Sequence, residues 1–238
     1  MAYGYWTAYN VLKQVAGELG LPIPATVTGL SDVQSVQLLS LLNSAGNELM
    51  LYYPWEQFTQ EFTITLVAAQ TDYTLPTDLN YFTDQTQWDR TNHWPLLGPK
   101  SPQEWAWLKG ALVASLPRMR YRIQDDLFKV FPPPAGPATL AMEYTKNLWI
   151  TLAAGGEGSM IVADADILQY NPWLLIKFVK LKFYELKGFK TDGVTADFMR
   201  VFNSLTGKDV GAKILSLAPE YAPQFLGPWS IPDGSWSV

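Results

Sequence analysis

The sequence predicts an α+β protein in which a helical bundle domain, built from N- and C-terminal segments, carries an inserted small antiparallel β-domain. Near both ends, apolar residues recur every three or four positions, which places them on one face of a helix. In the middle of the chain the pattern alternates with period two, which is typical of half-buried strands. After Ala218, prolines recur at positions 219, 223, 228 and 232, so this segment is expected to be an extended tail.

These patterns divide the chain of 238 residues into three parts. Residues 1–55 and 151–217 are expected to pack together as one discontinuous helical domain. Residues 56–150 are expected to form the β-domain, with one short helix packed on it. Residues 218–238 are expected to form an extended C-terminal arm. A chain of this length is sufficient for one or two domains with a buried core.

Helix positions follow from apolar spacing and from end signals. Four helices are expected at Thr7–Leu19, Ser31–Tyr53, Trp173–Leu186 and Thr195–Leu205. Glycine closes three of them, at Gly20, Gly188 and Gly207. The fourth, Ser31–Tyr53, has Ser31 and Gln34 at the spacing of a capping box. Its buried face is expected to hold Val33, Val36, Leu39, Leu42, Ala45, Leu49 and Tyr52.

Strands and turns fill the middle of the chain. Strands are expected at Phe62–Val67, Tyr73–Leu75, Tyr81–Trp88 and Ala138–Tyr144. A hairpin is expected to join Arg118–Ile123 to Leu127–Phe131 through the acidic turn Asp125–Asp126. Ser101, Pro102 and Glu104 mark the start of the short helix.

Composition excludes several classes of function. The net charge of −5 and the sequence pI of about 4.9 oppose strong nucleic-acid binding, which needs a basic face. The absence of cysteine excludes disulfides, a thiol nucleophile and a Cys-ligated metal site. No run approaches the roughly 20 apolar residues of a membrane span, so no membrane partner is expected.

No catalytic constellation appears. His93 is the single histidine and is expected in a loop, and no nucleophile motif accompanies it. Asp164 and Asp166 are interpreted as a solvated loop before a helix. The glycine-rich run at residues 155–159 lacks the Lys–Ser/Thr ending of a phosphate loop. We therefore expect no catalytic residue, cofactor or metal, and we expect that the protein is not an enzyme.

Two basic features have open interpretations. Arg118, Arg120 and Arg122 alternate along a strand and so share one face, either solvated or paired with carboxylates of a neighbouring molecule. The expected helix at Trp173–Leu186 is locally basic, and its face is either solvated or turned toward an acidic partner or DNA. The candidate residues for an intersubunit or partner face are Arg118, Arg120, Arg122, Lys177, Lys180 and Lys187.

The C-terminal arm is rich in aromatic residues. Proline keeps such a segment extended and reduces the entropy lost on docking. The arm either folds back on its own domain or docks into a partner. Its candidate partner-binding residues are Tyr221, Phe225, Trp229, Ile231 and Trp236.

Two stretches resemble a known family. One runs from Trp55 and Phe58 through Phe62-Thr-Ile-Thr-Leu and Asp72-Tyr73 to Pro76 and Asp78-Leu79. The other contains Tyr121, Asp125, Leu127, Val130, Pro132 and Pro134 and ends in Glu143-Tyr144. With helices before and after them, they resemble the head-to-tail adaptors of tailed bacteriophages, also called tail tubular or tail accessory proteins. The resemblance covers residues 30 to 205.

The resemblance implies a structural virion protein of the neck, assembled in the host cytoplasm. It implies a ring, usually of twelve copies, that docks under the portal protein and extends the DNA channel. DNA would pass through without specific binding and be ejected by this route. Neighbouring copies and tail nozzle or fibre proteins are the other implied partners. In that arrangement the arm at residues 218–238 would reach the portal, and the helices would form the ring wall.

The sequence leaves two alternative functions open. A carbohydrate-binding β-module would use tryptophans as stacking platforms, with Trp88, Trp94 and Trp107 as the candidates. A carboxylate-based glycosidase would need two placed carboxylates in a cleft, and the sequence shows no such constellation.

Overall fold

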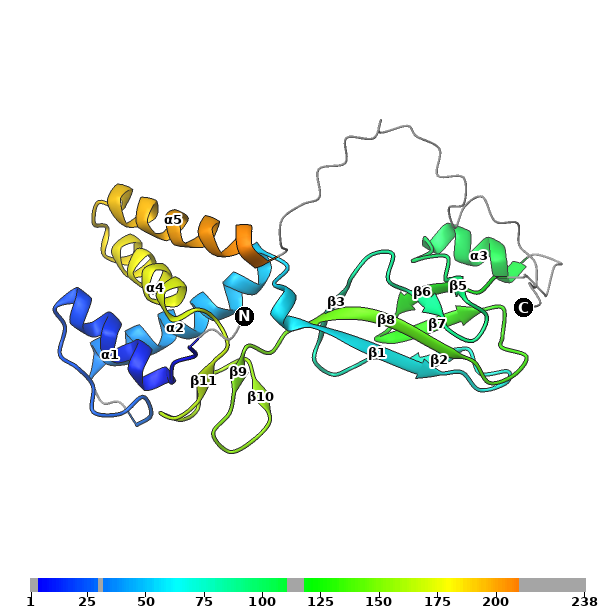
Figure 1. Ribbon diagram of the computed structural model, residues 1–238, viewed down its shortest axis with the longest axis horizontal. Coiled ribbons are helices and arrows are strands. Elements are labelled where there is room, and N and C mark those ends of the chain that lie inside the picture. Colours follow the sequence, from blue (N-terminus) through cyan, green and yellow to red (C-terminus); the bar gives the residue numbers. More distant parts are fainter. Residues whose placement is uncertain (1–3, 30–31, 111–117, 210–238) are drawn as a thin grey trace. The chain divides into compact units, whose positions relative to one another are not determined.

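The computed structural model describes residues 4–29, 32–110 and 118–209, and it confirms the α+β class (Figure 1). The chain divides into two compact units. The described residues of Met1–Phe58 and Lys146–Lys213 form a helical unit, and Thr59–Thr145 form a β-unit. The expected arm at 218–238 lies outside the described residues.

The first two helices are capped by side-chain oxygens. Helix α1 (Ala8–Leu19) begins after Thr7, whose hydroxyl accepts from the Asn10 backbone N–H at 3.3 Å, and it ends at Gly20 with φ 67°. Helix α2 (Val33–Tyr52) begins after Asp32, whose carboxylate accepts from the Ser35 N–H at 3.0 Å. The expected Ser31 cap is therefore wrong, because the adjacent carboxylate caps the first turn instead.

The expected buried face of α2 is only partly correct. Val33, Val36 and Tyr52 are 79%, 48% and 59% exposed, whereas Leu38, Leu42 and Leu49 are buried. Three residues rotate a helix by only about 300°, so three such steps from Val33 to Leu42 end about half a turn away. The buried face instead mixes steps of three and four residues. It also includes Ala45 and Gly46.

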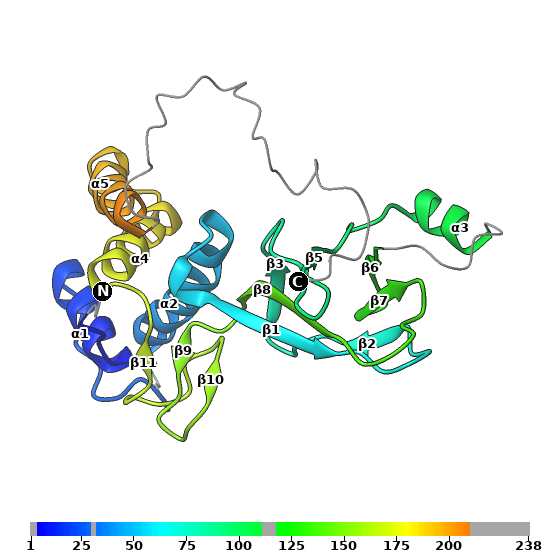
Figure 2. The same ribbon diagram turned by 45° about the vertical axis from the view of Figure 1, so that its right-hand side comes forward.

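The last two helices pack against each other (Figures 1 and 2). Helix α4 (Pro172–Lys187) has Asn171 as its N-cap and Gly188, with φ 69°, as its C-cap. Helix α5 (Asp192–Asp209) is longer than expected at both ends and continues through Gly207. The last turn of α5 contacts the residue that follows α2, because the Tyr53 hydroxyl donates to the Thr206 carbonyl at 3.3 Å.

The core of the helical unit lies between α1, α2, α4 and a small sheet. That sheet has the order β10-β9-β11, with β9 at Ile150–Thr151, β10 at Glu157–Gly158 and β11 at Ile167–Leu168. Gly155 and Gly156 lie in the turn between β9 and β10, but Glu157 and Gly158 form β10 itself, so the loop interpretation of this run is only partly correct. The largest fully buried side chains of this core include Trp149, Tyr170, Phe58, Leu12, Leu38, Leu42 and Leu49.

The β-unit contains two antiparallel sheets around a second core. One sheet has the order β1-β8-β4-β5, and β3 also pairs with β8. The other has the order β2-β7-β6. The strands are β1 (Thr59–Thr65), β2 (Asp72–Thr74), β3 (Leu79–Phe82), β4 (Trp88–Asp89), β5 (Trp94–Pro95), β6 (Arg120–Gln124), β7 (Leu127–Phe131) and β8 (Thr139–Lys146).

Most of the expected strands are present, with one correction. The stretch Tyr81–Trp88 is not one strand, because a turn with Gln85 at φ 64° separates β3 from β4. The acidic hairpin is confirmed, with Asp125 and Asp126 both at positive φ between β6 and β7. Helix α3 (Pro102–Gly110) is capped by Ser101, and Glu104 closes the capping box.

Candidate functional site

The surface of the helical unit exposes several large apolar side chains. Leu51 and Tyr52 at the end of α2 are 78% and 59% exposed. Trp173, at the start of α4, is 47% exposed and contacts Trp6 with ring centroids 5.9 Å apart. Other exposed apolar side chains of this unit include Val33, Val36, Leu186, Phe189 and Met199. Contiguous apolar surface on a protein commonly marks contact with other molecules.

The lysines of α4 make ion pairs within the unit. Lys177 and Lys180 both contact the Glu18 carboxylate of α1, at 3.2 and 3.3 Å. Burial alone would raise the pKa of Glu18, but hydrogen bonds from Lys177, Gln14 and Lys180 outweigh it and lower the pKa. Lys182 binds Glu48 of α2 at 2.5 Å. Sequence reasoning missed these acidic partners, because they lie more than a hundred residues away in the chain.

Lys187 occupies a different environment from Lys177 and Lys180. Its ammonium lies 5.4 Å from the centroid of the Phe183 ring, at the end of α4. A cation at the C-terminus of a helix also interacts favourably with the helix dipole. Of the three candidate lysines, Lys187 therefore contacts its own helix, and the other two link α4 to α1.

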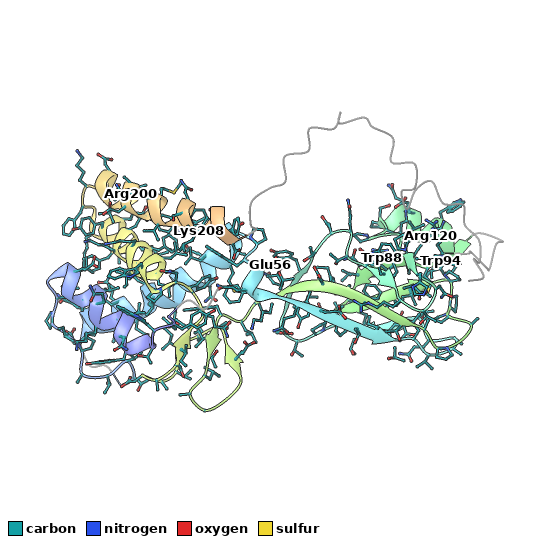
Figure 3. The ribbon with its side chains drawn as sticks, viewed as in Figure 1. Glu56, Trp88, Trp94, Arg120, Arg200 and Lys208 are labelled. Carbon is teal, nitrogen blue, oxygen red and sulfur yellow. The ribbon has the colours of Figure 1, made fainter. Side chains whose placement is uncertain are left out.

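The arginine row lies on and beside strand β6. Arg120 and Arg122 flank Tyr121, which is 2% exposed, so the two arginines share the face opposite the core. Arg118 precedes the strand. Arg122 stands opposite Lys129 of β7, so two cations face each other across the pair. Within the described residues, Nη1 of Arg120 is buried and has no hydrogen-bond acceptor. Figure 3 labels Arg120 in the β-unit.

The three candidate tryptophans do not gather on one platform. Trp88 pairs with Pro95 and Trp94 pairs with Asp89 in the β4–β5 ladder. Because successive strand residues point to opposite faces, Trp88 and Trp94 lie on opposite sides of this hairpin. Trp107 stands on α3 and is 70% exposed. The three candidate tryptophans of the carbohydrate-binding alternative therefore do not form one shared stacking surface.

The acidic and histidine candidates have structural surroundings. Among residues 4–29, 32–110 and 118–209, no group of three or more His, Cys, Asp or Glu side chains could hold a metal ion. His93 lies in the β4–β5 turn at φ 58°. Asp166 is fully buried, which corrects the expectation of a solvated loop. Its carboxylate accepts backbone N–H groups from Ala153, Val162 and Ala163 at 2.8 to 2.9 Å.

The candidate partner-binding residues of the C-terminal arm lie outside the described residues. They are Tyr221, Phe225, Trp229, Ile231 and Trp236. None of the helices in the described part of the chain is both long enough and apolar enough to span a bilayer.

Comparison with known proteins identifies the family. Residues 7–201 match the family described as SU10 adaptor protein, a family of phage head-to-tail adaptors. The match covers most of the chain, so the protein belongs to this family. A search of curated proteins found no match.

Family membership confirms the resemblance that the strand and turn motifs indicated. The protein is a bacteriophage head–tail adaptor, a structural component of the virion neck that associates with portal and tail proteins.

Proposed function

We propose that the protein forms a ring under the portal, extends the DNA channel and provides the docking platform for the tail nozzle or fibres. The exposed apolar side chains of the helical unit, with Leu51 at 78% exposure, are the observation that carries this proposal. A subunit in a ring buries two different flanks against its neighbours. Such flanks need apolar surface that is solvent-exposed in a single chain.

In this arrangement α2 and α4 form the ring wall. The arginine row of β6 supplies a second contact, because Arg120 needs an acceptor from outside the described residues. A carboxylate of a neighbouring copy would satisfy it through a charge-assisted hydrogen bond. Arg118 and Arg122 extend the same contact along the strand.

DNA passes through the ring without specific binding. The net charge of −5 favours this, and Glu18 and Glu48 already neutralise lysines of α4. Few cations are therefore available to grip phosphates, and a wall that does not bind phosphates lets the duplex move. Mapping the charge on an assembled ring tests this part, and a strongly basic lumen would contradict it.

The arm at residues 218–238 anchors the adaptor to the portal. Light scattering with and without the cognate portal ring tests the whole proposal. The full chain should form a stoichiometric complex, and a chain ending at Leu217 should not. A complex that persists after the deletion would move the anchor to the helices. No complex at all, from well-folded protein, would overturn the adaptor ring.

A matched pair of surface variants tests the flanks separately. Leu51→Glu in the helical unit should leave the fold intact and prevent ring formation on the portal. Val67→Glu alters an equally apolar but 54% exposed side chain of the β-unit and should leave the ring unchanged. Equal ring formation by both variants would remove α2 from the subunit contact.

A further inference from the structure

The two sheets of the β-unit cover one core from different sides. The core residues from β1 and β8 are Ile64, Leu140 and Met142, and those from β6 and β7 are Tyr121, Phe128 and Val130. Because successive strand residues point to opposite faces, the residues between them point away from the core. The β-unit therefore has two outer sheet faces, and Figure 3 labels one residue of each, Trp88 and Arg120.

The outer face of the first sheet carries two carboxylates side by side. Glu61 of β1 stands directly opposite Glu143 of β8, and both are exposed. The Glu143 N–H donates to the Thr86 hydroxyl at 3.0 Å, and its carbonyl accepts from the Thr83 N–H at 2.9 Å, so neither group faces β1. The two glutamates are consequently a non-hydrogen-bonded pair, the position where facing side chains lie closest. Arg90 pairs with Glu61 at 2.5 Å, whereas Glu143 has no ion-pair partner among the described residues.

An exposed aromatic ring and a hollow lie beside this pair. Trp88 of β4 stands opposite Ala141 of β8, two residues before Glu143, and its side chain is 38% exposed. A hollow of about 310 Å³ is lined by Trp88, Glu61, Arg90, Glu143, Gln85 and Thr86. An indole face attracts a guanidinium, and a carboxylate binds it through charge-assisted hydrogen bonds. The hollow therefore has the chemistry to receive an arginine side chain.

The outer face of the second sheet carries the opposite charge. Arg122 of β6 stands directly opposite Lys129 of β7, so two cations face each other. Lys129 contacts the Asp125 carboxylate at 3.6 Å and has Asp72 of β2 opposite it on its other side. Arg122 makes no ion pair with the described residues. Two positions earlier on the same face, Nη1 of Arg120 is buried without an acceptor.

Each outer face therefore has one unpaired charge, and the two charges have opposite signs. Like charges directly opposite each other in a sheet are destabilising, so both pairs cost stability in a single chain. In each pair one member already has an opposite charge within the chain, and the other member, Arg122 or Glu143, does not. These two residues point away from one core on different sides, so they do not meet within one chain. Contact between two copies would relieve both repulsions at once.

We propose that the face of β6 in one copy docks on the hollow beside Trp88 in the next copy. The Arg122 guanidinium then stacks on the Trp88 ring and pairs with the Glu143 carboxylate, with Arg120 at the same contact. This inference rests on the ring of the proposed function and names a contact between its copies. A contact between two different faces is heterologous, and its repetition gives a ring when the rotation closes.

Exchange of the two charges tests the pairing. Arg122→Glu and Glu143→Arg should each weaken assembly on the cognate portal ring about tenfold or more in sedimentation, because each removes an opposite charge from the contact. The variant that carries both changes should recover most of this loss. Each single change replaces a like-charge pair by opposite charges, so the urea midpoint of the free chain should not fall. Arg200→Glu, at an exposed arginine of α5, is the control and should assemble like the natural chain.

The outcomes separate this contact from the ring itself. Full assembly by both single variants would overturn the contact and leave the ring in place. Failure of the natural chain to assemble would overturn the ring, and the contact with it. A doubly exchanged variant that assembles no better than the single variants would show that Arg122 and Glu143 do not pair.

Cysteine cross-linking tests the direction of the contact. The natural sequence has no cysteine, so copies with Arg122→Cys and copies with Glu143→Cys can be mixed on the portal ring and oxidised. The mixture should give a disulfide-linked dimer, and either variant alone should give little. A strong dimer from one variant alone would indicate a two-fold contact and contradict the heterologous arrangement. An assembled ring without the mixed dimer would remove these two faces from the contact.

Discussion

The indole of Trp149 lies directly against the backbone of Gly46 in α2, in the space that a Cβ atom at position 46 would occupy. The ring is held there by two hydrogen bonds. Its Nε1–H donates to the Asn47 side-chain carbonyl at 3.0 Å and to the Ser159 backbone carbonyl at 3.1 Å. Trp149 is fully buried, so this contact joins the second helix to the chain that returns from the β-unit.

Gly46→Ala should therefore destabilise the helical unit. In an open helix the same change stabilises, by up to about 1 kcal/mol. At position 46 the added methyl displaces Trp149, and overpacking of this kind costs about 1–3 kcal/mol. The measurement is the urea midpoint of unfolding. Gly17→Ala in α1 is the control and should be neutral or stabilising, because nothing lies within 4 Å of its Cβ position.

Asp166→Asn should weaken the segment between β9 and α4. Burial alone would raise the pKa of Asp166, but the three backbone N–H donors outweigh it and lower the pKa. The substitution removes the charge from these hydrogen bonds and should cost about 2–3 kcal/mol at pH 7. Thermal unfolding of both proteins at neutral pH measures this loss of stability. An unchanged melting temperature would show that the carboxylate does not hold this segment.

The same carboxylate should make stability depend on pH in a defined direction. Because the folded pKa lies below its ordinary value, the ionised form stabilises the fold above about pH 4. This stabilisation is lost as the pH falls through the folded pKa. The acid-induced loss should therefore be smaller in Asp166→Asn than in the natural protein. Equal slopes of stability against pH below 4 would contradict this assignment.

Glu18→Gln should destabilise the α1–α4 contact through the two lysines it leaves behind. Lys177 and Lys180 would then be close together without a carboxylate between them. The side chains of this cluster are about one-fifth exposed, so we expect a loss of about 1 kcal/mol that shrinks at high salt. Asp192→Asn, which breaks the highly exposed pair with Lys190, is the control and should have almost no effect. Denaturation of both variants at two salt concentrations compares their losses of stability, and only the loss in Glu18→Gln should depend on salt.

Phe198→Ala should release α5 from the helical unit. Phe198 is 6% exposed and is the one buried side chain that the structure describes in α5, and it stacks on Phe178 with ring centroids 4.7 Å apart. Its removal should cost about 3–4 kcal/mol or detach the helix locally. Hydrogen exchange along α5 measures the second outcome. Met199→Ala, at a neighbouring 44% exposed side chain, should leave exchange in α5 unchanged.

Local signals in the sequence predicted some features well and others poorly. Asn171-Pro172 and Gly188 placed α4, and Asp125–Asp126 placed the β6–β7 turn, because caps and tight turns depend on neighbouring residues. The boundaries of α5 were wrong, since Gly207 remains helical where tertiary contacts hold the last turn. The arginine row was visible from its alternation. The ion pairs of Lys177 and Lys180 were not, because Glu18 is distant in the chain.

The amino-acid sequence by itself determined the α+β class, the approximate helix and strand positions, and the resemblance to head-to-tail adaptors. These properties depend on periodicity and on short-range geometry, which the order of residues contains. The tertiary structure alone decided which faces are buried, as with Val33 and Val36 at the surface and Asp166 in the interior. It also decided that Lys177 and Lys180 contact Glu18, because burial and ion pairs depend on which distant segments meet.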